Sequence, residues 1–132
     1  LEKTNGDLVD YYGALIRLRI AHPVLHLASA DEVGAYFDWV PSSNWKTTIG
    51  YKFFGLAKDN DFVVLINYDG ATRKLDVPFP SLGKWHVMCD GKLAKSTLPS
   101  LRTIDVSSTT KPQTISVPPR SAMILMSERV NP

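Results

Sequence analysis

The chain has 132 residues, enough for one domain around a single apolar core, and 44% of them are hydrophobic. The formal net charge is only +2 and the 15 Lys and Arg residues are scattered, which argues against nucleic acid as a partner. No run of about 18 apolar residues occurs, so the sequence predicts no membrane span. Cys89 is the single cysteine, which excludes a disulfide framework and a cysteine-based zinc site.

The first predicted element is a helix over residues 8–22, and the short polar residues within 5–7 can supply its N-cap. Apolar residues recur through this stretch at helical spacing. The helix should end at His22, because Pro23 disfavours helical geometry in the residue before it. The chain begins at Leu1 rather than Met and enters this helix almost directly, so we interpret it as a piece of a longer polypeptide.

The rest of the chain predicts β structure. Ser29 and Glu32 are spaced as a capping box for one short helical turn. Asp69-Gly70 predicts a tight hairpin, and Pro118-Pro119 predicts a bend or a sheet edge. Residues 92–111, rich in Ser and Thr, are expected to be irregular. Aromatic and β-branched residues predict strands at 35–40, 48–56, 61–68, 72–77, 85–90, 113–117 and 121–126.

Short strands at close spacing, separated by Gly and Pro turns, are typical of an antiparallel arrangement. A parallel sheet would need helices between its strands, and none is predicted after residue 35. The predicted fold is therefore mainly β: an antiparallel β-sandwich of the Greek-key type, preceded by an N-terminal α-helix.

The predicted helix is apolar over an unusually wide arc. At 100° per residue the apolar arc spans roughly 200°, whereas a helix packed on one core needs about 100°. We expect one flank to pack on the sandwich and the other to be exposed or buried by another copy of the chain. The first flank holds Tyr11, Leu15 and Leu18, and the second holds Val9, Ile16 and Ile20.

The tryptophans are the candidates for ligand binding, because flat apolar rings can stack on sugars. Trp85 lies in a predicted strand and is expected in the core. Trp45 lies in the polar loop at residues 41–46, and Trp39 lies near the end of a predicted strand. Trp45 and Trp39 are therefore the candidate substrate-binding residues.

Two segments together resemble a known family. Residues 7–23, DLVDYYGALIRLRIAHP, carry a tyrosine pair, then Leu-Ile-x-Leu-Arg, then His-Pro, and SADEV follows at 29–33. The tail carries DFVVLINY at 61–68, GKWHVMCDG at 83–91 and ISVPPRSAMIL at 115–125. In this order the motifs are similar to the last barrel helix and the C-terminal β domain of bacterial type I pullulanases, in the α-amylase superfamily.

The resemblance implies a division of the chain. Residues 1–28 would be the terminal helix and linker of an upstream catalytic barrel, and 29–132 a C-terminal β-sandwich. The parent enzyme would hydrolyse α-1,6 branches of glucans with a retaining pair of carboxylates, both located upstream. The upstream barrel of the same polypeptide is then the expected partner, with weak glucan contact as a further one.

No catalytic residue, metal ligand or cofactor site is predicted within the chain itself. The three histidines lack metal-ligand spacing, and we expect the ring of His22 to bond to backbone at the helix exit. The acidic side chains are expected to serve in caps, in turns and on the solvated surface. Among them are Asp10, Asp31, Glu32, Asp38, Asp59, Asp61, Asp69, Asp76 and Asp90.

Two other functions stay open at this point. One is an autonomous carbohydrate-binding module that uses exposed aromatic residues, and the other is an adhesion-type sandwich with a protein partner. Neither explains the N-terminal helix, because a binding module should fold without it.

Overall fold

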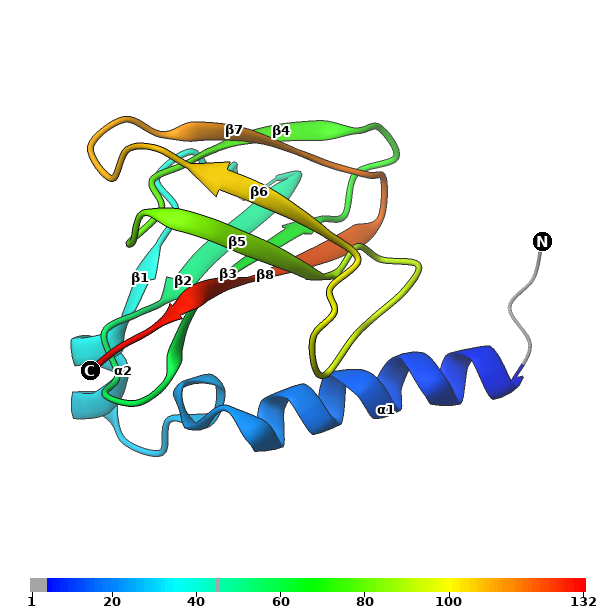
Figure 1. Ribbon diagram of the computed structural model, residues 1–132. Coiled ribbons are helices and arrows are strands. Elements are labelled where there is room, and N and C mark those ends of the chain that lie inside the picture. Colours follow the sequence, from blue (N-terminus) through cyan, green and yellow to red (C-terminus); the bar gives the residue numbers. More distant parts are fainter. Residues whose placement is uncertain (1–4, 45) are drawn as a thin grey trace.

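The computed structural model describes residues 5–44 and 46–132, with side chains from residue 9 onward. Within these residues two α-helices and a short 3-10 helix precede eight strands (Figure 1). The helices are α1 (Asn5–Ala21), the 3-10 helix η1 (Pro23–His26) and α2 (Ala30–Tyr36). The strands are β1 (Phe37–Trp39), β2 (Thr48–Phe53), β3 (Asn60–Asn67), β4 (Arg73–Val77), β5 (Gly83–Cys89), β6 (Arg102–Val106), β7 (Gln113–Val117) and β8 (Ser121–Val130).

The strands form two antiparallel sheets, which confirms the predicted mainly β sandwich with an N-terminal helix. Six strands pair in the order β1-β2-β3-β8-β5-β6, and β4 pairs with β7 in a second sheet. Figure 1 shows three layers, with the β4–β7 pair on one side of the large sheet and α1 on the other.

Both faces of the large sheet are covered, so it borders two apolar cores. Val63, Leu65 and Trp85 face the β4–β7 pair, where they join Leu75 and Val117. On the opposite face, α1 and η1 place Leu18 and Val24 against Phe62, Met88 and Met126. This double burial explains why β3 is a continuous apolar run instead of an alternating one.

The end of α1 and the start of α2 lie where the sequence predicted them. The helix ends at Ala21, immediately before His22 and Pro23. The Ser29 hydroxyl accepts a hydrogen bond from the amide of Glu32 at 3.1 Å, which confirms the capping box. The helix that follows is longer than one turn and includes residues 35 and 36, so β1 begins only at Phe37.

The predicted hairpin at Asp69-Gly70 is wrong. After β3 the chain leaves the large sheet and enters β4 in the small sheet, where it pairs with β7. The buried Asn67 side chain organises this crossing: its oxygen accepts from the Asp69 amide at 3.0 Å and its NH2 donates to the Ala71 carbonyl at 2.9 Å. The turn after β3 is therefore held by the Asn67 side chain, and not by pairing of β3 with the next strand as the hairpin prediction expected.

Strand β6 was also not predicted, because it lies in the segment expected to be irregular. It is an edge strand that pairs only with β5, with Ile104 opposite Trp85. Its outward residues Thr103 and Asp105 are exposed, and this polar face hid the strand in the sequence. The bend predicted at Pro118-Pro119 is confirmed, since β7 and β8 belong to different sheets.

Candidate functional site

The acidic residues divide into two groups. Asp69 and Asp90 accept backbone N–H bonds in turns, as expected. The expected turn or surface role is wrong for Asp59 and Asp61, which are 4% and 3% exposed. The Asp61 carboxylate accepts from the Gly55 amide at 3.0 Å and the Asn131 side chain at 2.8 Å, so its burial is compensated by structural bonds.

Asp59 ties α1 to the start of β3. Its carboxylate lies 2.6 Å from Nδ1 of His22 and accepts from the amide of Val24 at 3.0 Å. His22 therefore bonds to a side chain, not to backbone as expected. The reason is that η1 folds back against the residue preceding β3, a contact between residues 37 positions apart that local spacing does not reveal.

The described residues contain no group of three His, Cys, Asp or Glu side chains that could hold a metal ion. Within the same part of the chain, no helix is both long and apolar enough to cross a membrane. The absence of catalytic residues from this chain stays a prediction that rests on the resemblance.

The tryptophans lie in different environments. Trp85 is fully buried and donates from its ring N–H to the Ser81 carbonyl at 3.0 Å, which confirms it as a core residue. Trp39 is 47% exposed on the edge strand β1, directly opposite Tyr51. Trp45 lies outside the described residues.

An aromatic cluster surrounds Trp39 on one face of β1 and β2. The Trp39 ring meets Phe37 at 87° and Tyr51 at 82°, so the rings pack edge to face. Burial raises the pKa of the Tyr51 phenol above its usual range. Rings packed in this way form a compact apolar cluster with one accessible indole, not a row of coplanar stacking surfaces.

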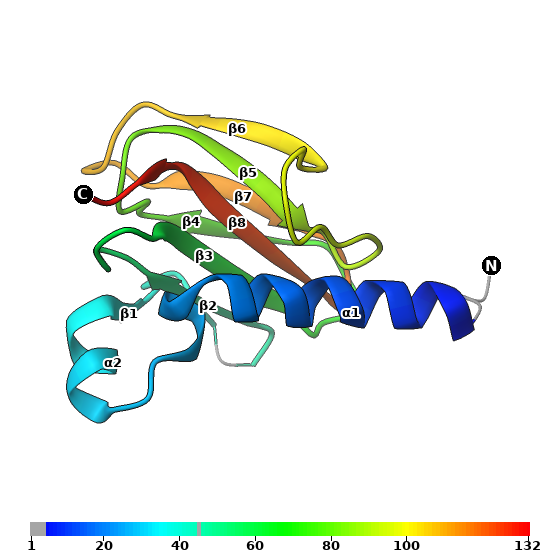
Figure 2. The ribbon, with the colours of Figure 1, turned by 60° about the horizontal axis from the view of Figure 1, so that its bottom comes forward.

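Helix α1 carries four large apolar side chains that are exposed on one side. Its sandwich side buries Ala14 and Leu18, which are 5% and 1% exposed. The opposite side forms what we call the outer stripe: Val9, Tyr12, Ile16 and Ile20, exposed by 68%, 59%, 58% and 71%. The expectation of two apolar flanks is thus confirmed, and Figure 2 shows α1 lying along the outside of the large sheet. An open depression of about 430 Å³ adjoins the stripe, lined by Ile16, Arg19, Ile20 and His26.

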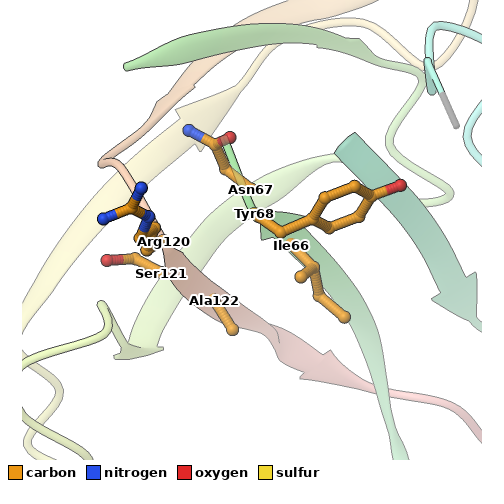
Figure 3. A pocket seen from close by; sticks show the side chains of 6 residues that line it. All are labelled: Ile66, Asn67, Tyr68, Arg120, Ser121 and Ala122. Carbon is orange, nitrogen blue, oxygen red and sulfur yellow. The ribbon is translucent and has the colours of Figure 1, made fainter. Parts of the chain in front are cut away.

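A second depression, of about 440 Å³, lies where β3 ends and β8 begins (Figure 3). It is lined by Ile66, Asn67, Tyr68, Arg120, Ser121 and Ala122. Sequence reasoning did not identify it. No local signal marks it, because its lining joins residues 66–68 to residues 120–122, which meet only through the pairing of β3 with β8.

No family model matches the chain. Among solved structures, it resembles pullulanase SAP of Group B Streptococcus with a TM-score of 0.71 and 18% identity, covering 92% of this chain and 16% of that one. It also resembles the catalytic module of SpuA, a glycogen-degrading pneumococcal virulence factor, with a TM-score of 0.71 and 18% identity, covering 95% and 18%. For type I pullulanase of Bacillus subtilis the TM-score is 0.64 and the identity 20%, covering 85% and 14%.

These similarities place the chain in one class of fold, a β-sandwich with one long helix packed on its outside. More particularly, this fold is found as a part of pullulanase chains, which confirms at the level of fold the resemblance seen in the motifs. The chain spans only 14% to 18% of the length of these structures, each of which is a much larger polypeptide.

Proposed function

We propose that this chain is the accessory β-sandwich of a pullulanase-like glycoside hydrolase, that it stabilises the catalytic barrel, and that it is not catalytic by itself. The observation that carries the proposal is the two-sided helix α1. One side is buried on the sandwich, while the opposite side exposes the outer stripe of four large apolar residues.

The outer stripe needs a partner. Full burial of each large apolar side chain is worth roughly 1.5–3 kcal/mol, so four of them can support a stable contact. The catalytic barrel of the same polypeptide is the partner that fits, because the matched pullulanases are far longer than this chain. In this proposal residues 1–28 are the terminal helix and linker of the barrel, and 29–132 are the accessory sandwich.

The proposed parent reaction is retaining hydrolysis of α-1,6 branches by two carboxylates about 5 Å apart. The buried pair Asp59 and Asp61 does not fit this role, since their oxygens are engaged by His22, Gly55 and Asn131. We expect the reading frame upstream of Leu1 to encode the barrel that holds the catalytic pair. An upstream sequence without a barrel pattern would overturn the proposal.

Activity measurements test the same proposal on the chain itself. We expect purified chain incubated with pullulan to release no reducing sugar above a buffer blank, because the carboxylate pair lies elsewhere. The control is the longer polypeptide, which should release it. Release by the chain alone, at a rate proportional to its concentration, would contradict the division of roles.

The second candidate is a carbohydrate-binding role through the two tryptophans that the sequence singles out, Trp39 and Trp45. The half-exposed indole of Trp39 favours it, because one accessible ring can stack on a sugar. The perpendicular rings around it limit the contact to about one sugar, so we expect maltotriose to bind in the millimolar range, about −4 kcal/mol.

Titration with maltotriose, followed by tryptophan fluorescence, measures this affinity. Trp39→Ala and Trp45→Ala should each weaken the response, whereas Tyr68→Ala, which removes an exposed aromatic ring elsewhere on the surface, should not. Micromolar affinity would favour an autonomous carbohydrate-binding module over the accessory role.

A further inference from the structure

His86 is a buried histidine whose two ring nitrogens have unequal surroundings. The residue lies on β5 and is 7% exposed. Its Nδ1 lies 3.0 Å from the hydroxyl oxygen of Ser100. Its Nε2 is buried without a hydrogen-bond partner among the described residues, and lies 3.5 Å from Oε1 of Glu128 on β8. A buried nitrogen without a partner is costly, so its position beside a carboxylate calls for a physical account.

The Ser100 hydroxyl determines which ring nitrogen carries the proton. This hydroxyl donates to the carbonyl of Arg102 at 3.1 Å, so its own hydrogen is engaged. Its oxygen can then only accept, and Nδ1 of His86 must supply the hydrogen of the contact between them. In neutral His86 the proton therefore lies on Nδ1, and Nε2 carries a lone pair on the side of the Glu128 carboxylate.

Neutral and protonated His86 interact with Glu128 in opposite ways. A lone pair opposite a carboxylate is repulsive, because both atoms only accept hydrogen bonds. When a proton binds Nε2, the same atom becomes a charged donor that faces an anion, and a charge-assisted hydrogen bond can form. The Glu128 side chain is 58% exposed, so it is free to move closer to the ring.

The sheet offers a second acidic residue at the matching position, and it does not reach His86. His86 pairs with Met126 of β8 and with Thr103 of β6. Glu128 and Asp105 follow these partners by two residues, so they lie on the same sheet face at equivalent diagonal positions. Among the described residues, only Glu128 forms an ion-pair contact with the His86 ring.

The other charged groups around His86 lie on the adjoining strands and on the connection that carries Ser100. Arg102 and Asp90 lie 3.8 Å from each other. The side of α1 that packs on the sheet is apolar, with Ala14 and Leu18 buried. Besides Glu128, the charged side chains of these segments are Lys84, Asp90, Lys92, Lys95, Arg102 and Asp105.

We propose that His86 and Glu128 form a pH-sensitive latch between β5 and β8. The latch is open while His86 is neutral, and it closes when a proton on Nε2 donates to the Glu128 carboxylate. Because the carboxylate favours the protonated ring in the folded chain, its contribution to stability grows as the pH falls through the range in which histidine titrates, and disappears above that range. Without Glu128, acid would place an unpaired charge on a buried ring and weaken the same junction.

The latch lies next to the contacts that attach α1. Ser127, directly before Glu128, accepts from the amide of Asp61 at 2.8 Å. Beyond the strand, the Asn131 side chain donates to the Asp61 carboxylate at 2.8 Å and to the Asp59 carbonyl at 3.0 Å. Closing the latch should therefore hold in place the end of β8 from which the buried carboxylates, and through them α1, are positioned.

Nitrogen NMR of the labelled chain tests the protonation of the ring. At about pH 8 we expect Nδ1 of His86 to give the signal of a protonated nitrogen and Nε2 that of an unprotonated one. At about pH 5 both nitrogens should give protonated signals, and the Nε2 hydrogen should exchange slowly with water because Glu128 accepts it.

Urea denaturation tests the latch itself. At about pH 5 we expect Glu128→Gln to raise the unfolding equilibrium constant roughly two- to fivefold, a small factor because exposed ion pairs contribute little. At about pH 8 the variant should be as stable as the unsubstituted chain or more stable, because the Gln amide can donate to Nε2. The matched control is Asp105→Asn, which removes the acidic group at the equivalent position on β6 and should have the same effect at both pH values.

Three results would overturn the proposal. One is a neutral ring that carries its proton on Nε2, and another is a ring that stays neutral at about pH 5. The third is a Glu128→Gln chain whose unfolding equilibrium constant differs from that of the unsubstituted chain by the same factor at both pH values, as expected for Asp105→Asn.

Discussion

At the scale of single residues, Trp85 is the largest fully buried side chain among the described residues and belongs to the inter-sheet core. It is fully buried, packs edge to face with Phe79 at 66°, and has its ring N–H satisfied by Ser81. We expect Trp85→Ala to lower the free energy of unfolding by about 3–5 kcal/mol, because removal of a large aromatic leaves a cavity. Urea denaturation followed by far-UV circular dichroism measures this loss.

The matched control is Trp39→Ala, which removes the same ring from a half-exposed position on an edge strand. That change should cost about 1 kcal/mol or less, since the ring contributes mainly edge contacts with Phe37 and Tyr51. Equal shifts of the urea midpoint for the two variants would contradict the assignment of Trp85 to the core.

Asn67 shows why the sequence predicted the strands better than their pairing. Strand β3 was predicted to within one residue at each end, because its apolar content is local information. The partner of β4 depended on Asn67, whose buried side chain donates to the Val117 and Pro118 carbonyls at 3.0 and 3.1 Å. An Asn-Tyr-Asp-Gly sequence looks the same whether the chain turns back or crosses to another sheet, so turn chemistry alone favoured the wrong alternative.

At the scale of elements, the attachment of α1 depends on a polar contact as well as an apolar one. The Asp59 carboxylate accepts from His22, Val24 and Asn60 within a buried environment. We expect Asp59→Ala to destabilise the chain by about 1–3 kcal/mol, because the buried amide of Val24 loses its acceptor. The loss should be local, so hydrogen exchange should accelerate in α1 and η1 more than in β3 or β8.

Asp76→Ala is the control for this change, since Asp76 is an exposed carboxylate that accepts a hydrogen bond from Thr114. Its effect should be about 0.5 kcal/mol and should leave exchange in α1 unchanged. Exchange that accelerates equally in all elements of the Asp59→Ala chain would show that α1 and the sandwich unfold as one unit.

The elements whose signals are local were the ones the sequence predicted. Pro23 and the Ser29–Glu32 box fixed the ends of the helices, and the two apolar flanks of α1 followed from helical geometry alone. The β3–β8 depression could not be predicted, because it joins residues 66–68 to 120–122 across strands paired only in the folded chain. The positive φ of Arg120 could likewise not be predicted from its neighbours in sequence.

At the scale of the whole molecule, the three layers leave one face of α1 exposed among the residues that the structure describes. The inner layers are complete in themselves: the β4–β7 pair covers one side of the large sheet, and α1 with η1 covers part of the other. The stability of the chain should therefore depend on the inner side of α1. Its association with other protein surfaces should depend on the outer stripe.

Paired substitutions on α1 separate these two roles. In this chain Leu18→Ala should lower the free energy of unfolding by about 2–5 kcal/mol, because Leu18 is 1% exposed. Ile16→Glu should change it by only about 0.5 kcal/mol, because Ile16 is 58% exposed.

The outer stripe should instead affect association. Sedimentation of the unsubstituted chain should show weak, concentration-dependent pairing through the outer stripe, and Ile16→Glu should abolish it, since a charge would be buried in the contact. In the longer polypeptide the same Ile16→Glu change should lower the melting temperature, because in the proposed arrangement the barrel covers the stripe there. An Ile16→Glu chain as destabilised in isolation as the Leu18→Ala chain would contradict this assignment, since it would mean that the stripe already has a partner within these 132 residues.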